Sequence, residues 1–573
     1  MKTVRLLPSG RVKQGRFIAP LHLVSCRRLR SRIALCWLAL IFCTVIGGAV
    51  GADNILRMAN KQGDANSLNP HRAIASHDRV IAEKIFNGLL RYPPGDVDVT
   101  KIEPDLARNL PVARILADGR QVWTFELRRG IKCHPYGRKP GYEVTARDIV
   151  YSLQRAADPA RSSFAGDFSG MTFAPAGKYI VDVTLPDPVT PYLFLPKFTN
   201  RGGGLVVPEK VLEEMGEAWF NSHPVGTGPF RFESYTPLEK VVLSANPDYF
   251  RGRPALDGIE YNYMPNLISR ELAIRKGEVD IIWGPREQIW AERFAGKSGL
   301  TVDVTGSVET MLVHLNMSIK PLNNLAVRQA IAQAINREEF IALYGPDIAK
   351  PIYSAVPSRM ISGLTASQVS RRGYQYEYNP ARARKLLAEA GYSQGFSLEV
   401  FVSDSDTYEK AYNLLLAHLG QVGIDLKLKI VDQATYHTRI RQNLNPLVAY
   451  VATRPTPDVI LSQFYHSESI VAAGSKPISN FCHLGGVDGD GDGVVDGIDS
   501  IIESARRELD PETQIELWRE AQFEILRLVA ALPIMDLGYT FARKPTLHWG
   551  YELKAITDGP KATEKTRLKS EES

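Results

Sequence analysis

Helix signals and strand signals alternate along most of this 573-residue chain, and this alternation constrains its fold more than any other feature. Strand patterns are rich in β-branched residues and alternate in polarity, whereas helix patterns open on a capping residue and close at Gly or Pro. Interleaved elements of the two kinds predict an α/β protein. We expect strands at 122–127, 179–185, 241–244 and 426–431, and helices at 145–158, 336–345, 379–391 and 510–533.

The first 52 residues differ from the rest in composition. They hold nine Lys or Arg and no acidic residue, and they include an apolar run at 33–50 that ends in small residues. This order is typical of a secretory signal, with cleavage expected after Ala52. The run also has the length of a short membrane span, so an uncleaved anchor is the alternative. We therefore expect the rest of the chain outside the cytoplasm, in the periplasm or associated with the membrane.

The remaining chain is close to neutral and has two cysteines. The formal charge of the whole sequence is +6, but nine of its 69 Lys and Arg lie in the N-terminal segment, which leaves 60 against 63 Asp and Glu. No basic stripe remains to bind phosphates, so no nucleic-acid partner is expected. Cys133 and Cys482 allow either one disulfide or two separate buried thiols.

Several short motifs follow one another in order along the chain. They are Leu68-Asn69-Pro70, Ile85–Leu89, Phe125–Lys132, Val144–Ser152, Pro224–Phe230, Asn246–Phe250, Gly277–Asp280 and Val327–Ile331. Their order and spacing resemble the extracellular solute-binding proteins of the peptide/nickel type, called family 5. Each motif is weak alone, and the series carries the resemblance.

The resemblance implies a two-lobe fold of the periplasmic-binding-protein type (type II, cluster C), with an extra subdomain in lobe I. Lobe I would span 53–307 and lobe II 308–529, and residues 530–560 would return to lobe I. The chain would cross between the lobes near 311–316 and 534–539. A ligand would bind between lobes that close by a hinge motion. The charged tail at 561–573 has no aromatic residue, and we expect it to be disordered.

The resemblance also implies a function. The protein would capture a peptide or similar polar solute and deliver it, as a monomer, to the transmembrane subunits of an ABC importer. The alternative is a membrane-anchored sensor or scaffold that uses the same cleft. No enzyme is expected, because the chain has no G-x-S-x-G or H-E-x-x-H motif and its eleven histidines are scattered.

Residues 450–457 match the segment that lines the ligand cleft in peptide-binding relatives. There, the pattern Trp-x-Ala-Asp-x-x-Asp-Pro supplies an aromatic wall and a carboxylate that pairs with the α-ammonium of the peptide. In this chain Tyr450 keeps the aromatic side chain, but Thr453 replaces the ammonium-binding Asp and Arg454 adds a positive charge. A buried ammonium without its partner is costly, which puts ordinary peptide capture in doubt.

Two interpretations of this segment remain open. The ligand is neutral, anionic or amino-blocked, such as a modified peptide or a glycoside, or a different acid anchors a peptide. Asp458, one turn of chain later, is a candidate for that acid. Phe86 and Asn87 are weaker candidates for the wall that lobe I contributes, and core packing is the alternative for both.

A second candidate site is independent of the resemblance. Residues 488–499 have the spacing of a calcium loop, with oxygen ligands at positions 1, 3, 5, 7, 9 and 12 and Gly at position 6. The ligands would be Asp488, Asp490, Asp492, the backbone carbonyl of Val494, Asp496 and Asp499. Position 12 is Asp instead of Glu, and coil precedes the loop. We expect a structural Ca²⁺, and a solvated acidic loop without metal is the alternative.

Overall fold

Two large hydrophobic cores divide the described chain into two lobes. The computed structural model describes residues 54–297, 299–306, 309–471, 479–556 and 559–569. Lobe I holds the core residues between 56 and 294 and between 541 and 562, and lobe II holds those between 311 and 537. The predicted signal segment at 1–52 lies outside the described residues. The mixture of helices and strands in both lobes confirms the α/β prediction.

Lobe I is built on a seven-stranded sheet. In sheet order its strands are β12 (Thr301–Val304), β19 (Thr540–Arg543), β11 (Ile281–Trp283), β1 (Ile55–Asn60), β10 (Gly258–Tyr263), β9 (Lys240–Ala245) and β8 (Phe230–Thr236). The central strand β1 is parallel to both of its neighbours, β10 and β11. Helices α1 (Ser76–Ile85), α6 (Leu267–Arg275) and α7 (Gln288–Lys297) pack against this sheet. The carboxyl ends of β1 and β11 therefore meet at one sheet edge.

A four-stranded antiparallel sheet is inserted between β1 and β8 of lobe I, together with several helices. Its strands are β4 (Val112–Ile115), β5 (Gln121–Glu126), β7 (Ile180–Leu185) and β6 (Thr172–Gly177). The helices are α2 (Ala146–Ala156), α3 (Pro191–Phe194), α4 (Glu209–Met215) and α5 (Glu217–Ser222). Helix α2 begins where predicted, because Asp148 accepts hydrogen bonds from the backbone and the hydroxyl of Thr145. Two-stranded pairs join β2 (Leu90–Arg91) to β3 (Glu103–Pro104) and β20 (Leu547–His548) to β21 (Arg567–Leu568).

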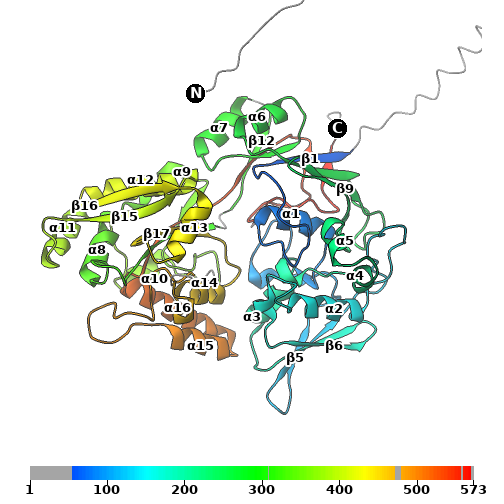
Figure 1. Cartoon of the computed structure of the whole chain (residues 1–573), viewed down its shortest axis with the longest axis horizontal. Helices are drawn as coiled ribbons and strands as arrows, with labels where there is room; N and C mark the ends of the chain where they lie inside the picture. Colours follow the sequence, from blue (N-terminus) through cyan, green and yellow to red (C-terminus); the bar gives the residue numbers. More distant parts are fainter. Residues whose placement is uncertain (1–53, 298, 307–308, 472–478, 557–558, 570–573) are drawn as a thin grey trace, which may run out of the picture. The chain divides into compact units, whose positions relative to one another are not determined.

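Lobe II combines a four-stranded sheet with a parallel strand pair. The sheet order is β14 (Ala349–Pro351), β18 (Ala531–Leu537), β13 (Glu309–Leu315) and β17 (Leu447–Ala452), and the pair is β15 (Phe396–Ser403) with β16 (Ile424–Val431). Helix α12 (Asp406–Gly420) connects this pair and packs against both of its strands (Figure 1). The other helices are α8 (Leu325–Ala334), α9 (Arg337–Tyr344), α10 (Ala366–Arg371), α11 (Pro380–Glu389), α13 (Gln433–Arg441), α14 (Pro457–Tyr465), α15 (Asp499–Arg507) and α16 (Pro511–Arg527).

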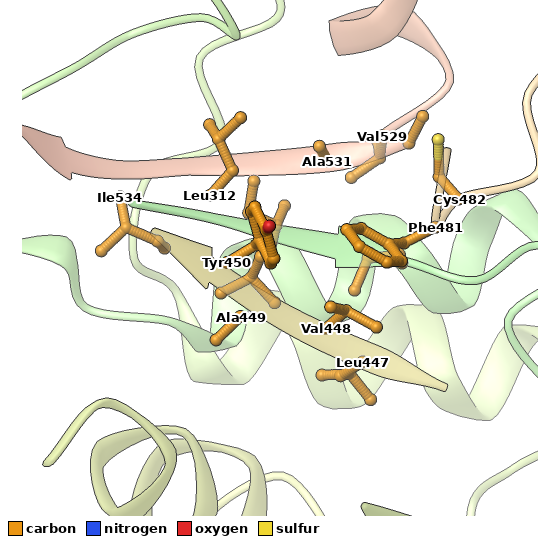
Figure 2. Packing of buried hydrophobic residues seen from close by; sticks show 14 of the residues in the cluster. Leu312, Leu447, Val448, Ala449, Tyr450, Phe481, Cys482, Val529, Ala531 and Ile534 are labelled. Atoms are coloured by element: carbon orange, nitrogen blue, oxygen red, sulfur yellow. The ribbon is translucent and has the colours of Figure 1, made fainter. Parts of the chain in front are cut away.

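The sheet of lobe II forms part of a continuous core. Figure 2 shows Tyr450 of β17 and Leu312 of β13 among apolar side chains, with Phe481 beside them. The ring centroids of Tyr450 and Phe481 lie 5.2 Å apart. Cys482 is buried in this core as a free thiol, and Cys133 is a free thiol in the core of lobe I. The two cysteines are therefore separate buried thiols and form no disulfide.

The chain crosses between the lobes between β12 and β13 and again between β18 and β19. Both β13 and β18 belong entirely to the sheet of lobe II, where they pair with each other. The crossings therefore lie between residues 304 and 309 and at residues 538–539, outside most of the segments 311–316 and 534–539 that the sequence suggested. An apolar strand has the same sequence pattern whether it lies in the core of a lobe or connects two lobes. The sequence therefore does not show which of these strands form the connection.

The predicted disordered tail is wrong for residues 561–569. Ala562 and Thr566 are fully buried, and β21 pairs with β20. The Thr566 hydroxyl donates a 3.0 Å hydrogen bond to the carbonyl oxygen of Trp549. Backbone pairing and small buried residues order this segment, although it has no aromatic residue of its own.

Candidate ligand-binding site

A polar pocket of about 230 Å³ lies between the two lobes. Lobe I contributes Asn60, the buried last residue of β1, Lys61, which follows it, and Arg286, which follows β11. Glu309 and Tyr539 line the pocket where the chain passes between the lobes. In α/β proteins ligands bind outside the carboxyl ends of parallel strands, and this pocket has that position in lobe I.

The lobe II side of this pocket consists of helix beginnings. Ser405 precedes α12, Thr407 and Tyr408 lie in its first turn, and Gln433 is the first residue of α13. From lobe I, Ser76 and His77 are the first two residues of α1 and also line the pocket. The first N–H groups of a helix have no partner inside the helix, so these ends present hydrogen-bond donors and partial positive charge.

The lobes are also joined by hydrogen bonds beside the pocket. Lys410 of α12 donates a 2.5 Å hydrogen bond to Glu287 of lobe I. The backbone N–H of Asp347 donates to the side chain of Gln288. At a separate place, the hydroxyl of Thr190 in lobe I donates a 2.7 Å hydrogen bond to Gln514 in lobe II. These contacts are ones that a hinge motion would break and form.

A partly buried ion pair lies at the charged end of the pocket. Arg286 donates a hydrogen bond to Glu309, and the hydroxyl of Tyr539 donates a 2.6 Å hydrogen bond to the same carboxylate. Burial acts to raise the pKa of Glu309, but the charge of Arg286 outweighs it and lowers that pKa. Burial likewise acts to lower the pKa of Arg286, and Glu309 outweighs it. Both groups are therefore ionised, and each carboxylate oxygen of Glu309 accepts one hydrogen bond.

Lys61 lies at the same end of the pocket. Its side chain is accessible to solvent, yet the surrounding protein lowers the pKa of Lys61 to about 8, and the neighbouring charge of Arg286 adds to that effect. Lys61 has no ion pair or hydrogen-bond partner among the residues that the structure describes. The pocket therefore offers an ammonium group that protein side chains leave unpaired.

The residues predicted from the cleft pattern lie beside a different and much smaller cavity. Tyr450 and Arg454 line a space of about 20 Å³, which has room for roughly one water molecule. Tyr450 is 9% exposed, and its hydroxyl accepts a 3.1 Å hydrogen bond from Arg441. Arg454 lies over the ring of Phe464 and donates to Gln463 and to the carbonyl oxygen of Thr453. A ligand-binding role for Tyr450, Thr453 and Arg454 stays a prediction.

Asp458 is engaged by another side chain. It lies in the first turn of α14, where Arg506 donates a 2.9 Å hydrogen bond to its carboxylate. A carboxylate already paired with a guanidinium is a poor anchor for a ligand ammonium. This ion pair argues against Asp458 as the acid that replaces the missing cleft aspartate, and both interpretations of the segment stay predictions.

Phe86 and Asn87 belong to the core of lobe I, so the candidate role in the cleft wall is corrected. Phe86 is fully buried and packs near Phe220. The Asn87 side chain donates a 2.8 Å hydrogen bond to Asp105 and accepts a 3.0 Å hydrogen bond from Thr227. Their side chains hold the segment after α1 in place, which explains why they sit within a family motif without facing the ligand.

The calcium-type loop brings part of its ligand set together. Carboxylate oxygens of Asp488, Asp490 and Asp496 lie within 4.8 Å of one another. Arg527 of α16 forms ion pairs of 2.7 Å with Asp490 and 3.1 Å with Asp496. These three carboxylates suit a hard cation, while the guanidinium of Arg527 supplies a positive charge at the same place.

The other predicted ligands of this loop lie apart from that cluster. Asp492 accepts a 2.8 Å hydrogen bond from the backbone of Val494, and Val494 itself is exposed. Asp499 is the first residue of α15 and accepts a 3.0 Å hydrogen bond from the backbone of Ser467. A complete calcium shell would require Asp492, Val494 and Asp499 to turn toward the cluster.

The family of the chain follows from comparison with known proteins. Residues 101–470 match the family of bacterial extracellular solute-binding proteins, family 5. The chain belongs to this family.

Curated relatives of this family 5 protein cover most of its length. It is 25% identical over 522 residues to di/tripeptide-binding protein 2 of Pseudomonas aeruginosa, covering 86% of this chain and 92% of the relative. It is 26% identical over 381 residues to the glutathione-binding protein GsiB of Salmonella choleraesuis, covering 64% and 67%. Proteins of this family are extracytoplasmic solute receptors of ABC importers, and this family 5 protein has that role.

Solved structures extend the comparison. The binding protein MoaA from A. tumefaciens R10, solved with mannopinic acid, is 36% identical and matches with a TM-score of 0.75, covering 91% of this chain and all of that one. The protein DppA from Helicobacter pylori, solved with the peptide STSA, is 23% identical with a TM-score of 0.71 and coverages of 90% and 98%. These matches confirm the predicted two-lobe fold. No helix among the described residues is long and apolar enough to span a membrane.

Sequence reasoning missed Lys61, Arg286 and Glu309. The available signal was position, because Lys61 and Arg286 each follow a strand of buried residues, and side chains at the carboxyl ends of parallel strands meet at one sheet edge. That signal requires knowing that β1 and β11 are neighbours. Some 220 residues separate these strands in the sequence, and nothing local shows that they pair.

Proposed function

We propose that this family 5 protein captures a polar solute of about dipeptide size in the pocket between its lobes. The observation that carries the proposal is the pocket itself, because residues from both lobes line it and its wall is mostly polar. A volume of about 230 Å³ lies below the ~300–1,000 Å³ of pockets for drug-sized ligands, which favours a small solute over a long peptide.

The relatives support two chemical classes for this solute. Peptides are named for di/tripeptide-binding protein 2 and for the DppA complex, and mannopinic acid for the MoaA complex. The absence of the cleft aspartate at Thr453 favours a solute without a free α-ammonium. We propose that the protein works as an exported monomer after loss of residues 1–52 and delivers the solute to permease subunits.

Isothermal titration calorimetry with the exported protein tests this proposal. The ligands are dipeptides, tripeptides, glutathione and mannopinic acid, and light scattering of the same samples measures the oligomeric state. Saturable binding of at least one compound and a monomer mass are expected. Absence of binding by all of them overturns the proposed ligand size, and N-terminal sequencing that finds residues 1–52 retained favours a membrane-anchored sensor.

We also propose that residues 488–499 bind a structural Ca²⁺. Support comes from the loop spacing and from the three convergent carboxylates, whose mutual repulsion a cation would relieve. Ca²⁺ would compete with Arg527 for Asp490 and Asp496 and would leave the ligand pocket unchanged.

Thermal melting with calcium or a chelator tests this second proposal. Calcium should raise the melting temperature, because a ligand that binds only the folded state stabilises it. The double variant Asp490→Ala/Asp492→Ala should lose this response, whereas Asp118→Ala, at a remote exposed turn, should keep it. A melting temperature of the original protein that is the same with calcium and with chelator overturns the metal site.

A further inference from the structure

Three hydrogen-bond donors without partners meet at the lobe I end of the pocket. Asn60 is 2% exposed, and its side-chain N–H₂ group has no hydrogen-bond partner among the described residues. The Nε of Arg286 is buried and likewise has none. The ammonium of Lys61 is the third. Buried donors without acceptors, such as those of Asn60 and Arg286, are rare in folded proteins, so we expect the end of this pocket to receive an acceptor.

Three helices begin at the same pocket and add further donors. They are α1 at Ser76, α12 after Ser405 and α13 at Gln433. Ser405 makes no side-chain hydrogen bond to its own helix, so it leaves the N–H groups of the first turn of α12 without a side-chain cap. Helix N-termini attract anions because their unpaired N–H groups and the helix dipole both favour negative charge.

The charge balance around this end is positive. Lys61, Arg286 and the nearby buried Arg270 supply three cations, and Glu309 supplies one carboxylate that Arg286 and Tyr539 already engage. Arg270 donates its hydrogen bonds to the backbone carbonyl oxygens of residues 264, 265 and 283.

The other acidic groups near the pocket do not line it. Glu287 and Asp406 both form ion pairs with Lys410. Asp78 accepts a hydrogen bond from the backbone of Asn66 with one carboxylate oxygen, and its other oxygen is buried without a partner among the described residues. Glu309 is therefore the one carboxylate among the described residues that line the pocket, and Arg286 and Tyr539 each occupy one of its oxygens.

We propose that the solute is a small organic anion whose carboxylate accepts hydrogen bonds from Asn60, Lys61 and Arg286 and which carries no free ammonium. This inference rests on the proposed function and names the charge class of the solute. An ammonium group at this place would meet the like charges of Lys61 and Arg286, whose side chains have no acceptor atoms, and a Glu309 carboxylate whose charge Arg286 already balances. A carboxylate accepts up to about four hydrogen bonds and would pair the donors that the protein leaves open.

A charge series on one scaffold tests the inference with the exported protein. The three probes are N-acetyl-alanyl-alanine, an anion, alanyl-alanine, a zwitterion, and alanyl-alanine amide, a cation. Calorimetry should give the tightest binding for the anion and the weakest for the cation. Equal or tighter binding of the zwitterion or the cation overturns the inference and leaves the proposed function standing. Failure of all three to bind, together with the wider panel above, overturns both.

A matched pair of lysine variants tests the role of the charge. Lys61→Gln should weaken binding of the anion about ten- to a hundred-fold, the usual effect of losing a hydrogen bond from a charged group, and should leave the melting temperature unchanged. Lys132→Gln removes an exposed lysine from the inserted subdomain and should leave binding unchanged. Equal anion affinity in Lys61→Gln and in the original protein overturns the assignment of Lys61.

Discussion

The two walls of the interlobe pocket differ in how they present positive charge. Lobe I contributes the full positive charges of Lys61 and Arg286, whereas lobe II contributes the carboxylate of Glu309, which pairs with Arg286, and the starts of α12 and α13 with uncharged side chains. Full charges distinguish ligands by their sign, while helix ends and neutral donors add affinity to any acceptor. The comparison therefore assigns selection of the ligand to lobe I and a supporting role on closure to lobe II.

Loss of Arg286 gives the largest expected effect. Arg286→Met leaves the partly buried Glu309 without its partner. This loss should lower the free energy of unfolding by up to about 3 kcal/mol. That value is the low end of the range for a buried ion pair, because Glu309 is 23% exposed. Urea unfolding measures the change. The double variant Arg286→Met/Glu309→Met removes both charges and should recover part of the loss. Equal stability of the single variant and the original protein would show that the ion pair between Arg286 and Glu309 does not stabilise the fold.

Restoring the missing cleft acid should reverse the ligand preference. Thr453 lies two residues after Val451, which lines the pocket, and we expect Thr453→Asp to place a carboxylate close to the ligand. We expect about tenfold weaker binding of N-acetyl-alanyl-alanine and about tenfold tighter binding of alanyl-alanine, as charge repulsion and charge-assisted pairing require. Calorimetry measures both, and Thr453→Asn is the uncharged control. An unchanged preference would mean that residue 453 does not face the ligand.

Anion affinity should fall as the pH rises through about 8. The surrounding protein and the charge of Arg286 lower the pKa of Lys61 to about 8, so above that pH the free protein loses the ammonium charge that attracts the anion. Arg286, Glu309 and Arg270 also act on Lys61. The guanidiniums stay protonated and Glu309 stays ionised in this range, so they do not cause the change.

Titration calorimetry between pH 6 and pH 9.5 measures this dependence. The affinity should be flat below pH 7 and should decrease by up to tenfold per pH unit well above pH 8. In Lys61→Arg the side chain keeps its charge throughout, so the profile should be flat up to pH 9.5. A decrease of the same size in Lys61→Arg would assign the titration to another group.

The smallest expected effect concerns the lobe II wall. Gln433→Ala removes one neutral hydrogen-bonding group at the start of α13 and should weaken binding about two- to tenfold, by the same factor for anion and zwitterion. Calorimetry with both probes measures this ratio. A larger loss for the anion than for the zwitterion would show that lobe II also selects charge, and the division between the walls would fail.

Local signals predicted the individual elements well. Asn379 and Asp510 each accept a hydrogen bond from the third residue of the helix that they were expected to cap. Strands β5, β7, β9 and β16 lie within two residues of the expected ranges. These signals depend on neighbouring residues alone, which is why they can be recognised without the fold.

The candidate site was only partly predictable. The replacement of the cleft aspartate by Thr453 is visible in the sequence and indicates a ligand without a free ammonium. The pocket itself is not, because Asn60, Arg286 and Gln433 come from segments far apart in the chain. The sequence also suggested Phe86 and Asn87 for the cleft wall, because a family motif does not show whether a side chain faces a core or a cleft.

The sequence by itself determined the family, the α/β class and the series of helices and strands, because caps, periodicity and ordered motifs are local properties. Only the tertiary structure decided where the solute is received. It placed the carboxyl ends of β1 and β11 side by side and brought the starts of α12 and α13 to them. Electrostatic selection depends on distances between groups that chain connectivity does not fix, and folding alone sets those distances.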